Sequence, residues 1–237
     1  MDNNKRIMVK YDNILKAIEE YTEKCLKYET YTYTNREGRK FNIEIAQIHK
    51  RTSFYKRLKE AKETQPEESK WRVITHTPNG EELGLEHWDN CRMFATKKGS
   101  TIAIQQDGTI ISVCKNQNSN DNMAGLMQFA VENGGDKLDT FDGNHSFYEH
   151  CGFKPISWTT FSSYGHAMTG NREDTPYGWN DKIDKTEPIM FMGYTGEHTT
   201  LSQNEAIQAK TEFYTNNAPS YTYEDGVQER ERAFENK

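Results

Sequence analysis

The sequence has few apolar residues for its length and no long hydrophobic run. Apolar residues make up 34% of its 237 residues. No stretch of about eighteen consecutive apolar residues occurs, so we expect no membrane-spanning helix. The first residues lack the apolar segment of a secretory signal, and we therefore expect a cytoplasmic protein.

Cysteine is also scarce, and no two cysteines are spaced as a metal-binding or redox pair. The four are Cys25, Cys91, Cys114 and Cys151. Their wide separation predicts free thiols and no structural zinc site. A nucleophile elbow, a Gly-Lys-Ser/Thr phosphate loop, a dinucleotide-binding fingerprint and an HExxH metal motif are all absent from the sequence.

Charge is divided unevenly along the chain. Residues 1–70 have a balance of +4 and the remainder −10, which together give the net charge of −6. The basic part could contact an acidic partner, or it could pack on its own acidic body. The excess is far below that of a basic domain, so we do not expect a nucleic-acid partner.

Residues 109–161 alternate between strand-like and helix-like patterns. A β-branched run at residues 109–114 follows an Asp-Gly pair, which is typical of a hairpin turn. Apolar residues then recur three, four, seven and eight positions after Met123, on one face of a helix. Residues 138–141 and 155–161 predict two further strands with a short helix between them. The order of elements predicts an α/β (α+β) fold in which a helix joins two parallel strands.

The flanking segments predict an N-terminal helix-hairpin-helix extension and a C-terminal helix. We expect a helix in residues 12–28, a hairpin in 31–48, a solvated linker helix in 50–70, strands at 71–75, 99–106 and 189–194, a terminal helix at 201–216 and a mobile charged tail from Asp225. The corresponding domains are 1–70, 71–200 and 201–237.

The segment FYEHCGF, residues 147–153, resembles the YekxGF signature of the GNAT superfamily of N-acetyltransferases. Gly125 lies at the start of a helix after a strand, as the acetyl-CoA pyrophosphate loop does in that family. The resemblance covers residues 99–192, about the middle half of the chain. It implies a mixed central sheet with flanking helices and acetyl transfer from acetyl-CoA to an amine on a small molecule or a protein.

The pyrophosphate loop departs from the family pattern Arg/Gln-x-x-Gly-x-Gly/Ala. Residues 119–124 or 120–125 can be laid on this pattern, but neither register has the basic or glutamine residue or the first glycine. Asn122 can replace a glycine, because asparagine tolerates positive φ. The helix N-terminus keeps its affinity for anions, whereas Asp121 would repel a pyrophosphate at short range.

The resemblance implies a set of cofactor-binding residues and one catalytic tyrosine. The cofactor-binding residues are Ser112, Val113, Asn122, Met123, Ala124, Gly125 and Leu126. Tyr148 matches the tyrosine that protonates the departing thiolate in that family. It could equally pack a short helix on the sheet, and the backbone of residues 111–113 could equally pair with a neighbouring strand.

A general base must take the proton of the acceptor amine. Asp139 and Asp142 lie at the end of the second parallel strand, where sites of open α/β sheets form, and His145 and His150 flank Tyr148. Each of these residues could instead be solvated. We expect no metal site at the neighbouring histidines, because no fourth ligand is evident.

The long segment at residues 162–188 carries aromatic and histidine side chains between glycines: Tyr164, His166, Tyr177 and Trp179. It could close over an acceptor or present a surface to a protein partner. The sequence therefore supports two hypotheses. One is an acyl-CoA-dependent N-acyltransferase, and the other is a non-catalytic GNAT-like binding module, encoded by a phage or mobile element, that engages a host protein. It leaves the oligomeric state and the acceptor open.

Overall fold

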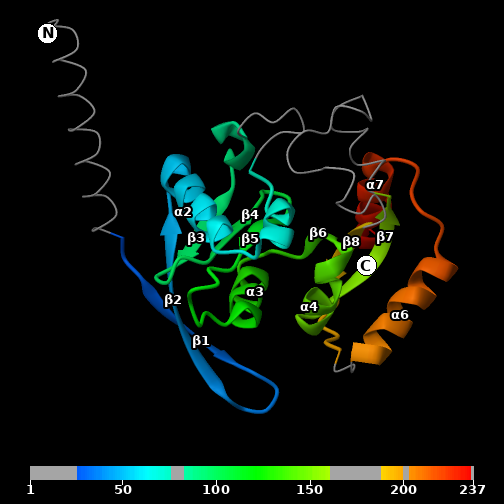
Figure 1. Ribbon diagram of the computed structural model, residues 1–237, viewed down its shortest axis with the longest axis horizontal. Coiled ribbons are helices and arrows are strands. Elements are labelled where there is room, and N and C mark those ends of the chain that lie inside the picture. Colours follow the sequence, from blue (N-terminus) through cyan, green and yellow to red (C-terminus); the bar gives the residue numbers. More distant parts are fainter. Residues whose placement is uncertain (1–25, 76–82, 161–187, 200–202, 236–237) are drawn as a thin grey trace, which may run out of the picture.

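The computed structural model describes residues 26–75, 83–160, 188–199 and 203–235 (Figure 1). They form a mixed α/β fold with two antiparallel sheets and, within these ranges, five α-helices. Most of the helix expected in residues 12–28 falls outside them. None of the described helices has the length and apolar character needed to cross a membrane.

Two sheets form the centre of the molecule. The larger has the order β1 (Glu29–Thr34), β2 (Lys40–Ile48), β3 (Arg92–Thr96), β4 (Thr101–Ile104) and β5 (Ile110–Cys114). The smaller has the order β6 (Lys137–Phe141), β8 (Ile189–Tyr194) and β7 (Phe153–Thr159). All neighbouring strands within each sheet are antiparallel.

Helices cover both faces of the sheets. They are α2 (Arg51–Glu63), α3 (Met123–Glu132), α4 (His145–His150), α6 (Gln203–Asn216) and α7 (Tyr223–Glu235), with 3-10 turns η1 (Glu67–Arg72), η2 (Leu85–Trp88) and η3 (Asp142–Asn144). Successive side chains of a strand point to opposite faces of the sheet, and each face has its own hydrophobic core. Phe94 and Ile102 pack with α3 on one face. Met93 and Ala103 pack with α2 on the other.

Several expected elements are confirmed. The first hairpin forms β1 and β2, the second forms β4 and β5, and α3, β6, α4, β8 and α6 lie within a few residues of their expected positions. The expectation that β5 and β6 pair as parallel strands of one sheet is wrong, because they belong to two antiparallel sheets that meet at one bridge. Thr109 and Lys137 form an isolated parallel bridge between the two sheets.

Other expectations are wrong. Residues 29–48 are no separate extension, because Ile45 of β2 pairs with Thr96 of β3 in one sheet. The helix expected to be a solvated linker buries Leu58 in the core. Residues 71–75 do not form a strand, since η1 runs to Arg72. The charged tail is ordered as α7, whose first turn is capped by reciprocal hydrogen bonds between Thr222 and Asp225.

The strands β5 and β6 separate immediately after their bridge. The amide of Asp136 donates to the carbonyl of Gly108 at 3.0 Å, and no further strand pairing joins β5 to β6 in the described residues. Beyond it, β5 contains a bulge at Ser112, where φ is +54° and the register against β4 shifts. A bulge bends its strand and increases its twist, so β5 is bent in the part that is not paired with β6.

We expect Leu58→Ala to lower the free energy of unfolding by about 2–5 kcal/mol, because Leu58 is fully buried between α2 and the sheet. Lys56→Ala, on the exposed side of the same helix, is the matched control and should change stability little. Chemical denaturation followed by circular dichroism measures both. Equal, small effects would show that α2 does not belong to the core.

Candidate functional site

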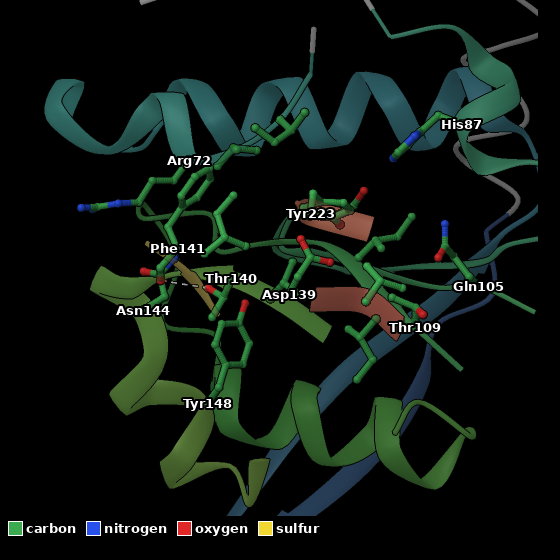
Figure 2. Close-up of a pocket in the computed structure, with 18 of the residues that line it drawn as sticks. Arg72, His87, Gln105, Thr109, Asp139, Thr140, Phe141, Asn144, Tyr148 and Tyr223 are labelled. Carbon is green, nitrogen blue, oxygen red and sulfur yellow. Dashed lines mark hydrogen bonds between the residues drawn. The ribbon is translucent and has the colours of Figure 1, made fainter. Parts of the chain in front are cut away.

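A cavity of about 470 Å³ opens between β5 and β6, where the two strands diverge (Figure 2). Its walls come from β5 and β6, from η1 and η2 on one side, from α4 on the other and from α7. The volume lies in the range of small-molecule sites. Several of the lining groups are ionisable, and they come from segments far apart in the sequence.

Tyr148 projects from α4 towards this cavity (Figure 2). Its side chain is buried, and its hydroxyl has a hydrogen bond with Thr140 of β6. Burial raises the pKa of Tyr148, and the nearby Cys151 and Asp139 raise it further. The phenol therefore stays protonated at neutral pH and can donate a proton into the cavity.

Asp139 lies in the middle of the cavity wall (Figure 2). The residue is deep in the protein, although part of its surface remains accessible from the cavity. Desolvation raises the pKa of this carboxyl, while the charge of Arg230 and a hydrogen bond with Tyr223 act in the opposite direction. A carboxylate with a raised pKa is a stronger base than an exposed aspartate.

The sequence analysis missed most of the lining residues, among them His87, Tyr223 and Arg230. His87 lies on the rim of the cavity in η2, with much of its surface exposed. The part of its ring that is shielded from water lowers its pKa. Tyr223 and Arg230 extend from the same face of α7, because they are seven positions apart. That spacing was the available signal, but the density of charged residues around it suggested a mobile tail instead.

Of the expected cofactor-binding residues, Ser112 and Val113 line the cavity. The hydroxyl of Ser112 accepts a hydrogen bond from Trp88 Nε1 at 3.0 Å, and its carbonyl accepts one from Thr101 Oγ1 at 3.1 Å. These bonds hold the bulge in place. The carbonyl of Ser112 is therefore already hydrogen-bonded, unlike the carbonyl of an unpaired strand, which a ligand could use.

The residues expected at the start of α3 lie away from the cavity lining. Asn122 caps the helix, its Oδ1 accepting from the amide of Gly125 at 2.9 Å, and Leu126 is fully buried. The amides of Met123 and Ala124 have no hydrogen-bond partner among the described residues. Two donors at the helix end therefore remain for an anion.

Packing accounts for Gly125. A Cβ atom at this position would lie 2.6 Å from Ile43 Cδ1 and 2.9 Å from Tyr33 Cβ. The β1–β2 hairpin therefore approaches the first turn of α3 too closely for any side chain there. Asp121 is also engaged, because its Oδ2 accepts from Thr96 Oγ1 at 2.6 Å and from Ser100 Oγ at 2.7 Å.

Asp142 is not among the cavity-lining residues and instead holds α6. Lys210 Nζ donates to its Oδ2 and Tyr214 Oη to its Oδ1, each at 2.7 Å. His145 and His150 also lie outside the cavity lining. Of the four candidates for the general base, Asp139 alone lines the cavity together with Tyr148.

The remaining candidates Tyr164, His166, Tyr177 and Trp179 lie outside the described residues. Comparison with protein-family models, with curated proteins and with solved structures finds no match to this chain. The cavity combines a protonated phenol with a basic carboxylate. Such a pair can give one proton to a leaving group and take another from a nucleophile.

We expect Asp142→Ala to weaken the docking of α6 and to lower the free energy of unfolding by about 1–3 kcal/mol, since Lys210 and Tyr214 lose their acceptor. Glu212→Gln changes an exposed residue of the same helix and serves as the control. Hydrogen exchange of the α6 amides reports the effect. Unchanged exchange in Asp142→Ala would contradict the anchoring role.

Proposed function

We propose that the protein is an acyl-CoA-dependent N-acyltransferase in which the two sheets continue as one GNAT-like sheet through the Thr109–Lys137 bridge. One observation carries the proposal. The strands β5 and β6 start side by side, diverge, and enclose a cavity into which Tyr148 and Asp139 project (Figure 2). The tyrosine and the segment between the strands are those on which the sequence resemblance depends.

The residues present fit the pantetheine arm of acetyl-CoA better than its pyrophosphate. The gap between β5 and β6 would receive the arm, with Ser112 and Val113 on one side. The free amides of Met123 and Ala124 are the donors left for a phosphate, since Asn122 already occupies the amide of Gly125. We expect acetyl-CoA to bind more weakly than it would to a loop with the full family pattern.

When bound, acetyl-CoA supplies an acyl group as an activated thioester. Asp139 takes the proton of the acceptor ammonium, so that the neutral amine can attack. Tyr148 Oη donates its proton to the sulfur that departs. The side chain of Thr140 is hydrogen-bonded to Tyr148 and orients the phenol. The raised pKa of Asp139 makes its ionised carboxylate a stronger base, although it narrows the pH range in which the group is ionised, and the raised pKa of Tyr148 keeps the phenol protonated.

The second candidate is a GNAT-like binding module without catalysis. It is favoured by the start of α3, where Asn122 caps the helix and the β1–β2 hairpin covers Gly125. A helix end that is closed in this way would no longer hold a cofactor, and the fold would serve to bind a partner. Calorimetry with acetyl-CoA separates the two candidates, because heat of binding at millimolar ligand is expected for the enzyme alone.

For the enzyme we expect Tyr148→Phe to lower kcat by about 10²- to 10⁴-fold, because the proton donor is lost. Tyr194→Phe, which packs on Phe153 and is not a lining residue, should leave kcat unchanged. Thiol release from acetyl-CoA with a panel of amines measures the rate, and circular dichroism confirms folding. A fully active Tyr148→Phe would remove this residue from the mechanism.

The pH dependence follows from the shifted pKa values. Asp139 accepts a proton only when ionised, so kcat/KM should rise with pH through a value above the ordinary aspartate pKa of about 3.9. Loss of the Tyr148 proton should appear only above the ordinary tyrosine pKa of about 10. In Asp139→Asn the acidic limb should disappear together with most of the activity. An unchanged profile in this variant would exclude Asp139 as the base.

A further inference from the structure

Arg230 is buried in the cavity wall with one side of its guanidinium group unpaired. The side chain is 3% exposed, and it lines the cavity from α7. Its Nε and Nη2 atoms donate to Glu231 Oε1 at 3.1 and 3.0 Å. Its Nη1 atom has no hydrogen-bond partner among the described residues.

The paired side fixes the orientation of the group. Glu231 also accepts from Lys137 Nζ, through its Oε2 at 2.6 Å, so the carboxylate is itself held at the first residue of β6. A guanidinium anchored along one edge presents the other at a constant position. Leaving two buried N–H donors unsatisfied is unfavourable, and an anionic ligand group would satisfy them.

The opposite charge lies close by. Arg230 is the strongest electrostatic influence that keeps the Asp139 carboxyl ionisable, and Tyr223, two turns away on the same face of α7, is hydrogen-bonded to Asp139. An ammonium at Asp139 and a carboxylate at Arg230 would therefore be only a short distance apart. In an α-amino acid these two groups are attached to the same carbon atom.

Apolar side chains make up much of the remaining wall. They are Ile74, Leu83, Ile111, Phe141, Ile189 and Val227. A ligand side chain that lies among them gains free energy if it is apolar and loses it if it is charged. The cavity thus combines one site for each charge of a zwitterion with space for a hydrocarbon group.

We propose, on the basis of the acyltransferase function above, that the acceptor is an apolar α-amino acid whose carboxylate accepts from Arg230 Nη1 and whose amine lies at Asp139. In the reaction the ammonium gives one proton to Asp139, and the neutral amine forms a bond to the acyl carbon. As the bond from that carbon to sulfur breaks, Tyr148 gives its proton to the sulfur, and its phenolate takes the second proton from the nitrogen. The products are an N-acyl amino acid and free CoA.

The test compares each amino acid with the amine that lacks only its carboxylate. The pairs are L-phenylalanine and 2-phenylethylamine, L-leucine and 3-methylbutylamine, and L-methionine and 3-(methylthio)propylamine. With the full-length protein and acetyl-CoA, kcat/KM should be ten- to a hundredfold higher for each amino acid, as expected for a charged hydrogen bond. Acetylation of the amines at an equal or higher rate would overturn the proposal.

Arg230→Met should abolish this preference, because the amino acids lose the contact to their carboxylate in addition to the slowing that both substrates share through the altered pKa of Asp139, whereas Arg230→Lys should retain part of it. If Arg230 served only as a counter-ion of Asp139, Arg230→Met would shift the pH profile and leave the preference intact, which would also overturn the proposal. Thermal shift with L-phenylalanine alone reports binding without turnover. Stabilisation of the wild-type protein that Arg230→Met loses, without any acyl transfer, would retain the carboxylate site and reject the acyltransferase function.

Discussion

The left-handed conformation of Ser112 is a constraint that shapes the β5 wall of the cavity. A non-glycine residue at positive φ costs free energy, and two hydrogen bonds offset this cost: Trp88 donates to its hydroxyl and Thr101 to its carbonyl. The bulge lies three residues beyond the bridge at Thr109, in the part of β5 that is not paired with β6. Ser112 and Val113 line the cavity from this bent segment.

The ionisable groups of the cavity depend on one another. Asp139 would be destabilised by burial alone, and the nearby Arg230 and Tyr223 make its charged form tolerable. Breaking such a buried pair by removing one partner is costly, because the other charge is left uncompensated. The helix α7 supplies both supporting groups. It therefore serves as a wall of the cavity and determines its electrostatic potential as well.

Local patterns in the sequence predicted the elements that are stabilised locally. The Asp107-Gly108 turn predicted the β4–β5 hairpin, and the apolar spacing after Met123 predicted α3. Two features escaped because they depend on tertiary contacts. The helix α2 looked solvated, since its charged residues outnumber the apolar face that it buries, and Arg230 looked like part of a charged tail, since nothing local shows that a helix brings it to Asp139.

The same limit applies to the site. Asp139 and Asp142 are equivalent candidates in the sequence, separated by three positions, and only packing assigns one to the cavity and the other to Tyr214. Gly125 matched a phosphate loop, but the close approach of Tyr33 Cβ, 2.9 Å from a Cβ atom at this position, gives a packing reason for glycine there. A residue type can thus satisfy a family pattern for a reason of packing.

The ion pair between Lys137 and Glu231 links two events, strand separation and helix docking. Lys137 is the residue at which β6 leaves β5, and Glu231 ties α7 to that point. A movement that widens the angle between the strands would therefore act on the C-terminal helix through this ion pair. The hydrogen bond between Tyr223 and Asp139 joins the same helix to β6 at a second point, so strand separation and helix docking share these contacts.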